Sequence, residues 1–126
     1  MKRVIIVQDS DSTSQALRLF LEESGAEIVG EAKNRLTVIR MLRELKPEIA
    51  IVDISLSESN SFEIMQLMKT LDQKIQMIVL SSCSQKHVIL QAMRAGACSF
   101  IMNPFNNGTC EQVAQLIKRH YIVDLN

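Results

Sequence analysis

Short apolar runs alternate with longer amphipathic segments along the whole of this sequence. Each run is bounded by polar or turn residues, as expected for a strand buried on both faces of a sheet. The five runs span residues 4–7, 28–30, 49–52, 75–80 and 98–102. The segments that follow them have apolar residues at helical spacing and end near Ser24, Pro47, Leu71, Ala95 and Tyr121. Five strands in strict alternation with five helices predict an α/β fold, with a parallel sheet covered by helices on both faces.

The composition fits one domain with an apolar core, because the chain has 126 residues and is 47% hydrophobic. Lys+Arg and Asp+Glu are both 14, so nothing predicts bulk affinity for nucleic acid or for an anionic membrane. No segment is long enough to span a membrane. Cys83, Cys98 and Cys110 form no Cys-x-x-Cys pair, which indicates reduced thiols in the cytoplasm rather than disulfides or a zinc site. We interpret these cysteines as small buried apolar residues.

Polar residues follow the apolar runs at the places where the predicted strands end. Gln8 and Asp9 follow the first run, Asp53 the third, Ser81 the fourth and Asn103 the fifth. Ligands of open α/β sheets bind outside the carboxyl ends of the strands. Right-handed crossovers leave few topologies, and in the order 2-1-3-4-5 the first and third strands are neighbours, about 4.8 Å apart. In that order Asp9 and Asp53 share one pocket.

Two carboxylates in one pocket repel each other unless a proton or a cation lies between them. Mg²⁺ suits such a site, since it takes one or two carboxylates and keeps several waters. We expect Asp9 and Asp53 to be ligands, with the backbone carbonyl of Ser55 nearby and Gln8 acting through a water. The alternative interpretation is that both acids cap loops or helices at the ends of their strands.

Five short motifs together resemble the receiver domain of two-component response regulators, in its single-domain, chemotaxis-type form. They are Val-Gln-Asp-Ser (7–10), Asp-Ile-Ser-Leu-Ser (53–57), Val-Leu-Ser-Ser (79–82), Ala-Gly-Ala (95–97) and Phe-Ile-Met-Asn-Pro-Phe (100–105). The resemblance covers essentially the whole chain. It implies a doubly wound, flavodoxin-like receiver fold of strand order 2-1-3-4-5, with residues 1–126 as one receiver domain.

The resemblance also implies roles for individual residues. Asp53 matches the phosphoacceptor, Asp9 a Mg²⁺ ligand, Ser81 the hydroxyl that binds the phosphoryl group, and Phe100 the aromatic switch residue. From the residues alone, Ser81 is equally a turn residue, and an aromatic such as Phe100 is more often plain core.

Four positions depart from the family pattern. Gln8 stands where a second acid is usual, Asn103 replaces the usual lysine, and Ser57 and Ser61 replace a proline and a glycine. Because an acid and a base are missing together, the formal charge of the site is unchanged. Charge-assisted hydrogen bonds contribute about 1.5–3 kcal/mol and neutral ones about 0.5–1.5 kcal/mol. The missing lysine therefore costs about 1–2 kcal/mol of coupling between phosphorylation and the active conformation.

The predicted function is that of a bacterial, cytoplasmic signalling receiver rather than an enzyme. A sensor histidine kinase or a phosphotransfer protein transfers a phosphoryl group to Asp53 with Mg²⁺. Output passes to a protein target, or to a homodimer, through the surface of helix four, strand five and helix five, without nucleic acid or membrane.

Three alternatives remain open at this point. The first is a pseudo-receiver, a protein-interaction module that works without phosphorylation. The second is an aspartyl-nucleophile phosphatase, which requires an acid two residues after the nucleophile, where Ser55 stands. The third is a flavin protein, since this topology hosts several functions. No Trp and a single Tyr, Tyr121, leave little aromatic cover for a flavin.

Overall fold

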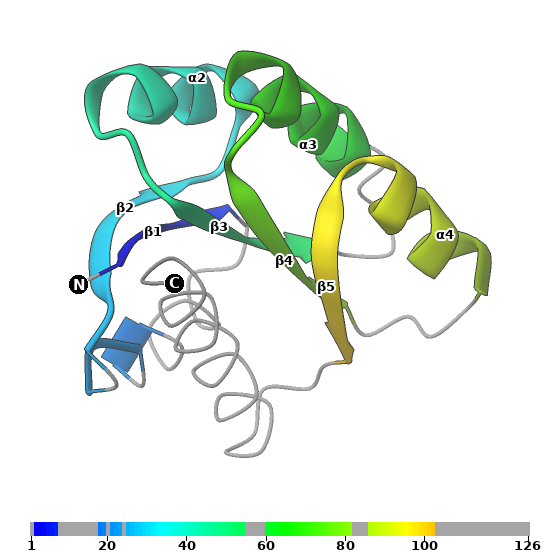
Figure 1. The fold of residues 1–126 in the computed structure, drawn as a ribbon, viewed down its shortest axis with the longest axis horizontal. Coiled ribbons are helices and arrows are strands. Elements are labelled where there is room, and N and C mark those ends of the chain that lie inside the picture. The colour runs from blue at the N-terminus through cyan, green and yellow to red at the C-terminus, as the bar shows by residue number, and fades with distance from the viewer. Residues whose placement is uncertain are drawn as a thin grey trace.

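The structure is a computed structural model that describes residues 2–7, 18–19, 21–23, 25–54, 60–81 and 86–102. Within these ranges the elements, labelled in Figure 1, are β1 (Arg3–Val7), β2 (Glu27–Ala32), α2 (Arg35–Glu44), β3 (Ile49–Ile54), α3 (Asn60–Leu71), β4 (Gln76–Ser81), α4 (Lys86–Arg94) and β5 (Ala97–Met102). Residues 18–19 and 21–23 are also helical. The predicted last helix lies outside the described residues.

The five strands form one parallel sheet in the order β2-β1-β3-β4-β5, which confirms the predicted topology. β3 is the central strand and pairs with β1 on one side and β4 on the other. β2 and β5 are the edges. β2 is six residues long, whereas the apolar run predicted residues 28–30. An edge strand pairs on one side only, so it can include polar residues. Polar residues of β2 such as Glu27 therefore pair with β1, although they do not belong to the apolar run from which the strand was predicted.

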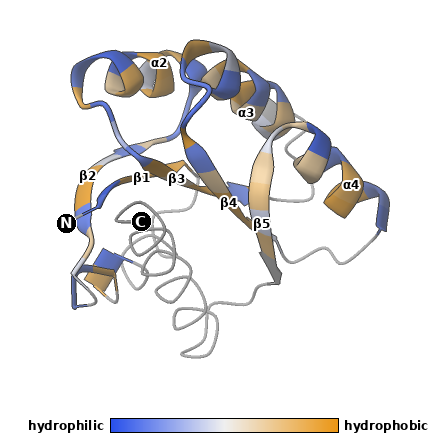
Figure 2. Cartoon of the chain, viewed as in Figure 1, coloured by the Kyte–Doolittle hydropathy of each residue, from blue (hydrophilic) through white to orange (hydrophobic). Residues whose placement is uncertain are grey.

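Alternate residues of the strands build two cores, one on each face of the sheet. On one face, α2, α3 and α4 cover the sheet (Figure 1), and the buried strand residues are Ile5, Val7, Ala50, Val52, Ile54, Met77 and Val79. On the other face, Leu21 packs with Val4, Ile6, Ile49, Ile51, Ile78 and Leu80. Full burial of such a side chain contributes about 1.5–3 kcal/mol. The central strands are therefore hydrophobic through their middle, while the helices mix hydrophobic and hydrophilic residues (Figure 2).

The helix ends follow local sequence signals. Asn34 caps α2, because its side-chain oxygen accepts a hydrogen bond of 2.9 Å from the backbone N–H of Thr37. Gly25 ends the first helix with a φ of 94°, which a residue without a Cβ adopts at little cost. None of the helices in the described ranges is long and apolar enough to cross a membrane.

The α3 helix buries most of its apolar stripe but not the end of it. Ile64, Leu67, Met68 and Leu71 recur at helical spacing, which places them inward, and in the structure Met68 is buried and Ile64 packs against the core. In the structure Met65 and Met68 are fully buried, whereas Leu71 is 44% exposed. Leu71 is the last residue of α3.

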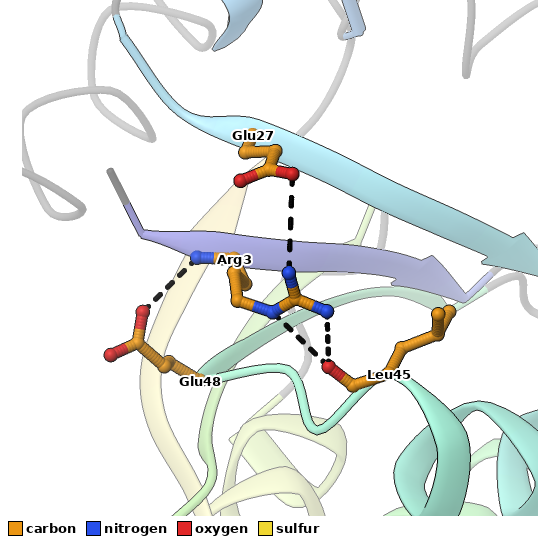
Figure 3. Close-up of polar contacts among 4 residues, drawn as sticks. All are labelled: Arg3, Glu27, Leu45 and Glu48. Carbon is orange, nitrogen blue, oxygen red and sulfur yellow. Dashed lines mark hydrogen bonds and ion pairs between the residues drawn. The ribbon is translucent and has the colours of Figure 1, made fainter.

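Arg3 joins three elements at the amino edge of the sheet (Figure 3). Its guanidinium Nε and Nη2 donate hydrogen bonds of 3.1 and 2.5 Å to the carbonyl of Leu45, the C-cap residue of α2. A third nitrogen, Nη1, lies 3.9 Å from a carboxylate oxygen of Glu27 on β2. The backbone N–H of Arg3 donates to Glu48 at 3.1 Å. The same carboxylate lies 3.5 Å from the amino group of the buried Lys2, so Lys2, Arg3, Glu27 and Glu48 have partners within the chain.

Candidate functional site

The carboxyl edge of the sheet brings Asp53 and Ser81 to the ends of neighbouring central strands. Asp53 pairs in register with Leu80, and Ser81 pairs with Ile54. The two residues are thus one step apart on strands that lie about 4.8 Å from each other. Asp53 is half-buried, and Ser81 is 1% exposed. Each of them interacts with another group of the chain.

The alternation of side chains places Asp53 and Ser81 on opposite sides of their strands. Asp53 continues the row of Ile49 and Ile51, whereas Ser81 continues the row of Met77 and Val79, which belongs to the other core. Their functional groups can therefore meet one ligand only where the strands end. Both residues satisfy this condition, because Ser81 is the last residue of β4 and Asp53 is the next to last of β3.

Phe100 lies on the edge strand β5, in register with Val79 of β4. It is half-buried and packs against the core beneath α2, α3 and α4. Its register places it in the same row as Val79, and hence on the face of the sheet to which Ser81 belongs. Phe100 is therefore a core residue, and it lies two positions before Met102, the strand partner of Ser81.

The other predicted site residues, Gln8, Asp9, Ser55 and Asn103, lie outside the described residues. β1 ends at Val7, which pairs with Val52, the residue before Asp53, so the chain leaves β1 beside the end of β3. Within the described residues no group of three or more His, Cys, Asp or Glu side chains could hold a metal ion. Asp53 supplies a hard oxygen ligand of the kind that Mg²⁺ prefers, and it lies next to the carboxyl end of β3.

Cys98 differs from the interpretation of the cysteines as buried residues, because it is exposed on the edge strand β5. Partial burial of its sulfur still raises the pKa of the thiol, while the side chain of Ser99 and the charge of Lys69 act in the opposite direction. Cys83 and Cys110 lie outside the described residues. His87 is exposed on α4, as an ordinary helix-surface residue.

The fold and the site together define a doubly wound α/β domain with an acid and a hydroxyl at the carboxyl ends of its central strands. The family model of the response regulator receiver domain matches residues 4–115. The chain is 34% identical over 104 residues to the chemotaxis protein CheY of Thermotoga maritima, a match that covers 82% of this chain and 87% of that protein. The chain therefore belongs to the response regulator receiver domain family.

Solved structures agree with this assignment. The response regulator domain of Thermotoga maritima CheB superposes with a TM-score of 0.76 at 28% identity, covering 94% of this chain and 92% of that one. A CheY-like receiver domain protein from Methanospirillum hungatei superposes with a TM-score of 0.81, covering 95% of this chain and 93% of that one. Because the two chains are 22% identical, this likeness shows a shared fold only.

Proposed function

We propose that this receiver domain accepts a phosphoryl group on Asp53 and transmits the change through protein contacts. The observation that carries the proposal is the position of Asp53: a half-buried carboxylate at the open end of the central strand, one step from the buried hydroxyl of Ser81. Ligands of such sheets bind at this edge. Receiver domains are signalling modules rather than classical enzymes, and the donor is a sensor histidine kinase or a phosphotransfer protein.

The chemistry requires a nucleophile and charge neutralisation. A carboxylate oxygen of Asp53 attacks the phosphorus of a phosphohistidine, forming a P–O bond as the P–N bond breaks, and the imidazole keeps the electron pair and takes up a proton. Receiver domains generally bind Mg²⁺ at this site, where the cation offsets the charge of the phosphoryl oxygens. Asp9 and the carbonyl of Ser55 are the proposed further ligands, with Gln8 acting through a water.

The readout of phosphorylation begins at Ser81. Its hydroxyl donates a hydrogen bond to a phosphoryl oxygen, which draws the end of β4 toward Asp53. Phe100 lies on the adjacent strand and on the same face, so it is the aromatic residue placed to follow that movement. Asn103 supplies a neutral hydrogen bond where a lysine is usual, which weakens the coupling by about 1–2 kcal/mol.

The output surface is formed by α4, β5 and the predicted last helix. Two apolar side chains of α4, Leu90 and Met93, are 44% and 47% exposed and lie three residues apart, on one side of the helix. Exposed apolar side chains that are grouped in this way suit a protein partner or a second copy of the chain. A nucleic acid is not part of the proposal.

A phosphoryl-donor experiment tests the proposal. The purified chain is treated with acetyl phosphate or with beryllofluoride, each with millimolar Mg²⁺, and is followed by intact mass and by the NMR spectrum of Phe100. We expect a covalent phosphoryl adduct and a shift of the Phe100 signals, both lost in Asp53→Asn and on removal of Mg²⁺. The absence of any response in the wild-type chain would instead support the pseudo-receiver, to which the substitutions at positions 8 and 103 point.

A further inference from the structure

The outer side of α2 carries an apolar residue and two arginines at helical spacing. Leu36, Arg40 and Arg43 are separated by four and three residues, so they lie along one side of the helix. All three are exposed, and Leu36 is 75% exposed. The opposite side of the helix carries the buried Val38 and Leu42, which face the sheet. We refer to Leu36, Arg40 and Arg43 as the α2 outer face.

Positive charge is concentrated around this face. Residues 33–46 contain five basic residues and one acid, Glu44, although the whole chain has no net charge. The basic residues are Lys33, Arg35, Arg40, Arg43 and Lys46, all of which are exposed. Such a segment attracts anionic groups even when the protein as a whole is neutral.

Arg43 lies in the last turn of α2, where the helix dipole favours positive charge, but the other two arginines of the helix gain no such stabilisation. Arg35 lies in the first turn of α2, which has no acidic residue, although the helix dipole favours negative charge there. Arg40 and Arg43 are like charges three residues apart. Within the described ranges neither of them forms an ion pair, not even with Glu44, which lies four residues after Arg40.

Four cations elsewhere in the described part of the chain have partners within the chain. Lys2 pairs with Glu48, and Arg3 with Glu27. Arg18 pairs with Glu31 on β2. The amino group of Lys69 donates to the backbone carbonyls of Gln73 and Ile75. The two arginines of the α2 outer face differ from these cations, because neither forms an ion pair within the described residues.

A surface hollow continues the basic surface at the end of α2. It has a volume of about 330 Å³ and is lined by Lys2, Lys46, Pro47, Glu48, Asp72, Lys74 and Gln76. Its two acids have partners within the chain: Glu48 binds Lys2 and the N–H of Arg3, and Asp72 accepts from the N–H of Lys74. The ammonium groups of Lys46 and Lys74 form no ion pair among the described residues, so the hollow favours an incoming carboxylate.

We propose that the α2 outer face, with Lys46 and Lys74 at its end, docks an acidic amphipathic segment of a partner protein. Carboxylates of the segment pair with the arginines and lysines, and an apolar side chain of the segment packs on Leu36. The exposed leucine favours a protein over a nucleic acid, because a phosphate backbone offers nothing apolar to cover it. α2 packs beside α3 and β2, whereas α4 packs beside β5, so this surface is distinct from the proposed output surface.

The test uses two labelled synthetic helical peptides and fluorescence anisotropy. One peptide is rich in Glu with leucines at helical spacing, and the other has the same charge with the leucines replaced by serine. We expect salt-dependent binding of the first peptide, with NMR shifts confined to α2 and residues 46 and 74, and at least about fivefold weaker binding of the second. Binding is expected to be unchanged in Asp53→Asn, so the result is independent of the proposed phosphorylation.

Matched variants distinguish binding at the α2 outer face from a general effect of the net charge of the protein. Arg40→Glu/Arg43→Glu is expected to weaken binding by at least about tenfold, and the neutral pair Arg40→Gln/Arg43→Gln by less. Lys86→Glu/Arg94→Glu makes the same change of net charge on α4 and is expected to leave binding within about twofold. Leu36→Ser is likewise expected to weaken binding, whereas Leu19→Ser, at an exposed leucine outside both proposed surfaces, is expected to leave binding within about twofold. Thermal unfolding of each variant verifies that it is folded.

Three outcomes would overturn the proposal. They are equal losses in the α2 and α4 reversals, no preference for the peptide with leucines, and tighter binding of a DNA duplex or of phosphatidylserine vesicles than of the peptide. The last result would assign the surface to a nucleic acid or to a membrane.

Discussion

The two edges of the sheet are built from the same strands but use charge in different ways. At the amino edge, Arg3 and Lys2 neutralise Glu27 and Glu48, and Arg3 also binds the end of α2. At the carboxyl edge, the core ends at a carboxylate, Asp53, and a buried hydroxyl, Ser81. The comparison teaches that the ion pairs of Lys2 and Arg3 link elements of the fold at one edge, while the acid at the other edge lies where this fold binds ligands.

The largest expected effect is the loss of the phosphoryl adduct when the carboxylate at the carboxyl edge is removed, compared with removal of one at the amino edge. Asp53→Asn is expected to abolish the adduct formed with acetyl phosphate, because an amide is not a nucleophile toward phosphorus. Glu48→Gln removes an acid at the opposite edge and is expected to leave the adduct intact. Intact mass spectrometry measures both. An adduct of undiminished yield in Asp53→Asn would place the nucleophile elsewhere.

The stabilising role of the amino edge is tested by Arg3→Ala. This substitution removes two hydrogen bonds to Leu45 and the ion pair with Glu27. Because the arginine side chain is partly exposed, we expect a loss of about 1–2 kcal/mol in the free energy of unfolding, measured with urea. Arg40→Ala, on the outer side of α2, is the control and should change stability by no more than about 0.5 kcal/mol. Equal effects of the two would contradict a special role for Arg3.

The proposed coupling between phosphorylation and the active conformation is tested by Asn103→Lys. Restoring the cation is expected to strengthen the coupling to the active conformation by about 1–2 kcal/mol, or roughly 5–30-fold in its equilibrium constant. The measurement is the beryllofluoride concentration that half-saturates the Phe100 shift in the presence of Mg²⁺. Asn106→Lys adds the same charge three residues away and should have little effect. A similar gain in both variants would indicate a general electrostatic effect.

The smallest expected effect concerns the turn that leads from α2 to the amino edge. Lys46 has a φ of 48°, a left-handed conformation that is unfavourable for a residue with a Cβ. Lys46→Gly is therefore expected to raise the free energy of unfolding by about 0.5–1 kcal/mol. Leu45→Gly, at the preceding right-handed C-cap, should lower it instead. A loss of stability in Lys46→Gly would show that its side chain contributes more than its backbone costs.

Most of the fold could be predicted from the sequence because strands buried on both faces leave uninterrupted apolar runs, as 49–52 and 75–80 do. The positions of Asp53 and Ser81 followed from the topological rule that strand ends share one edge. The amino-edge network could not be predicted, since Arg3 meets partners 42 and 45 residues away that no local pattern connects to it. The burial of Met65 in place of Leu71 depends on where α3 meets the sheet, which periodicity alone does not fix.

The central position of β3 has a consequence for the timescales of signalling. Backbone amides of a strand bonded on both sides exchange with solvent mainly through large-scale opening, whereas an edge strand opens more readily. Asp53 is therefore carried by backbone that stays in place, and Phe100 by the edge strand β5, which is bonded on one side. Hydrogen exchange should be slow along β3 and faster along β5, so that the proposed phosphoacceptor lies on the more rigid strand and Phe100 on the more mobile one.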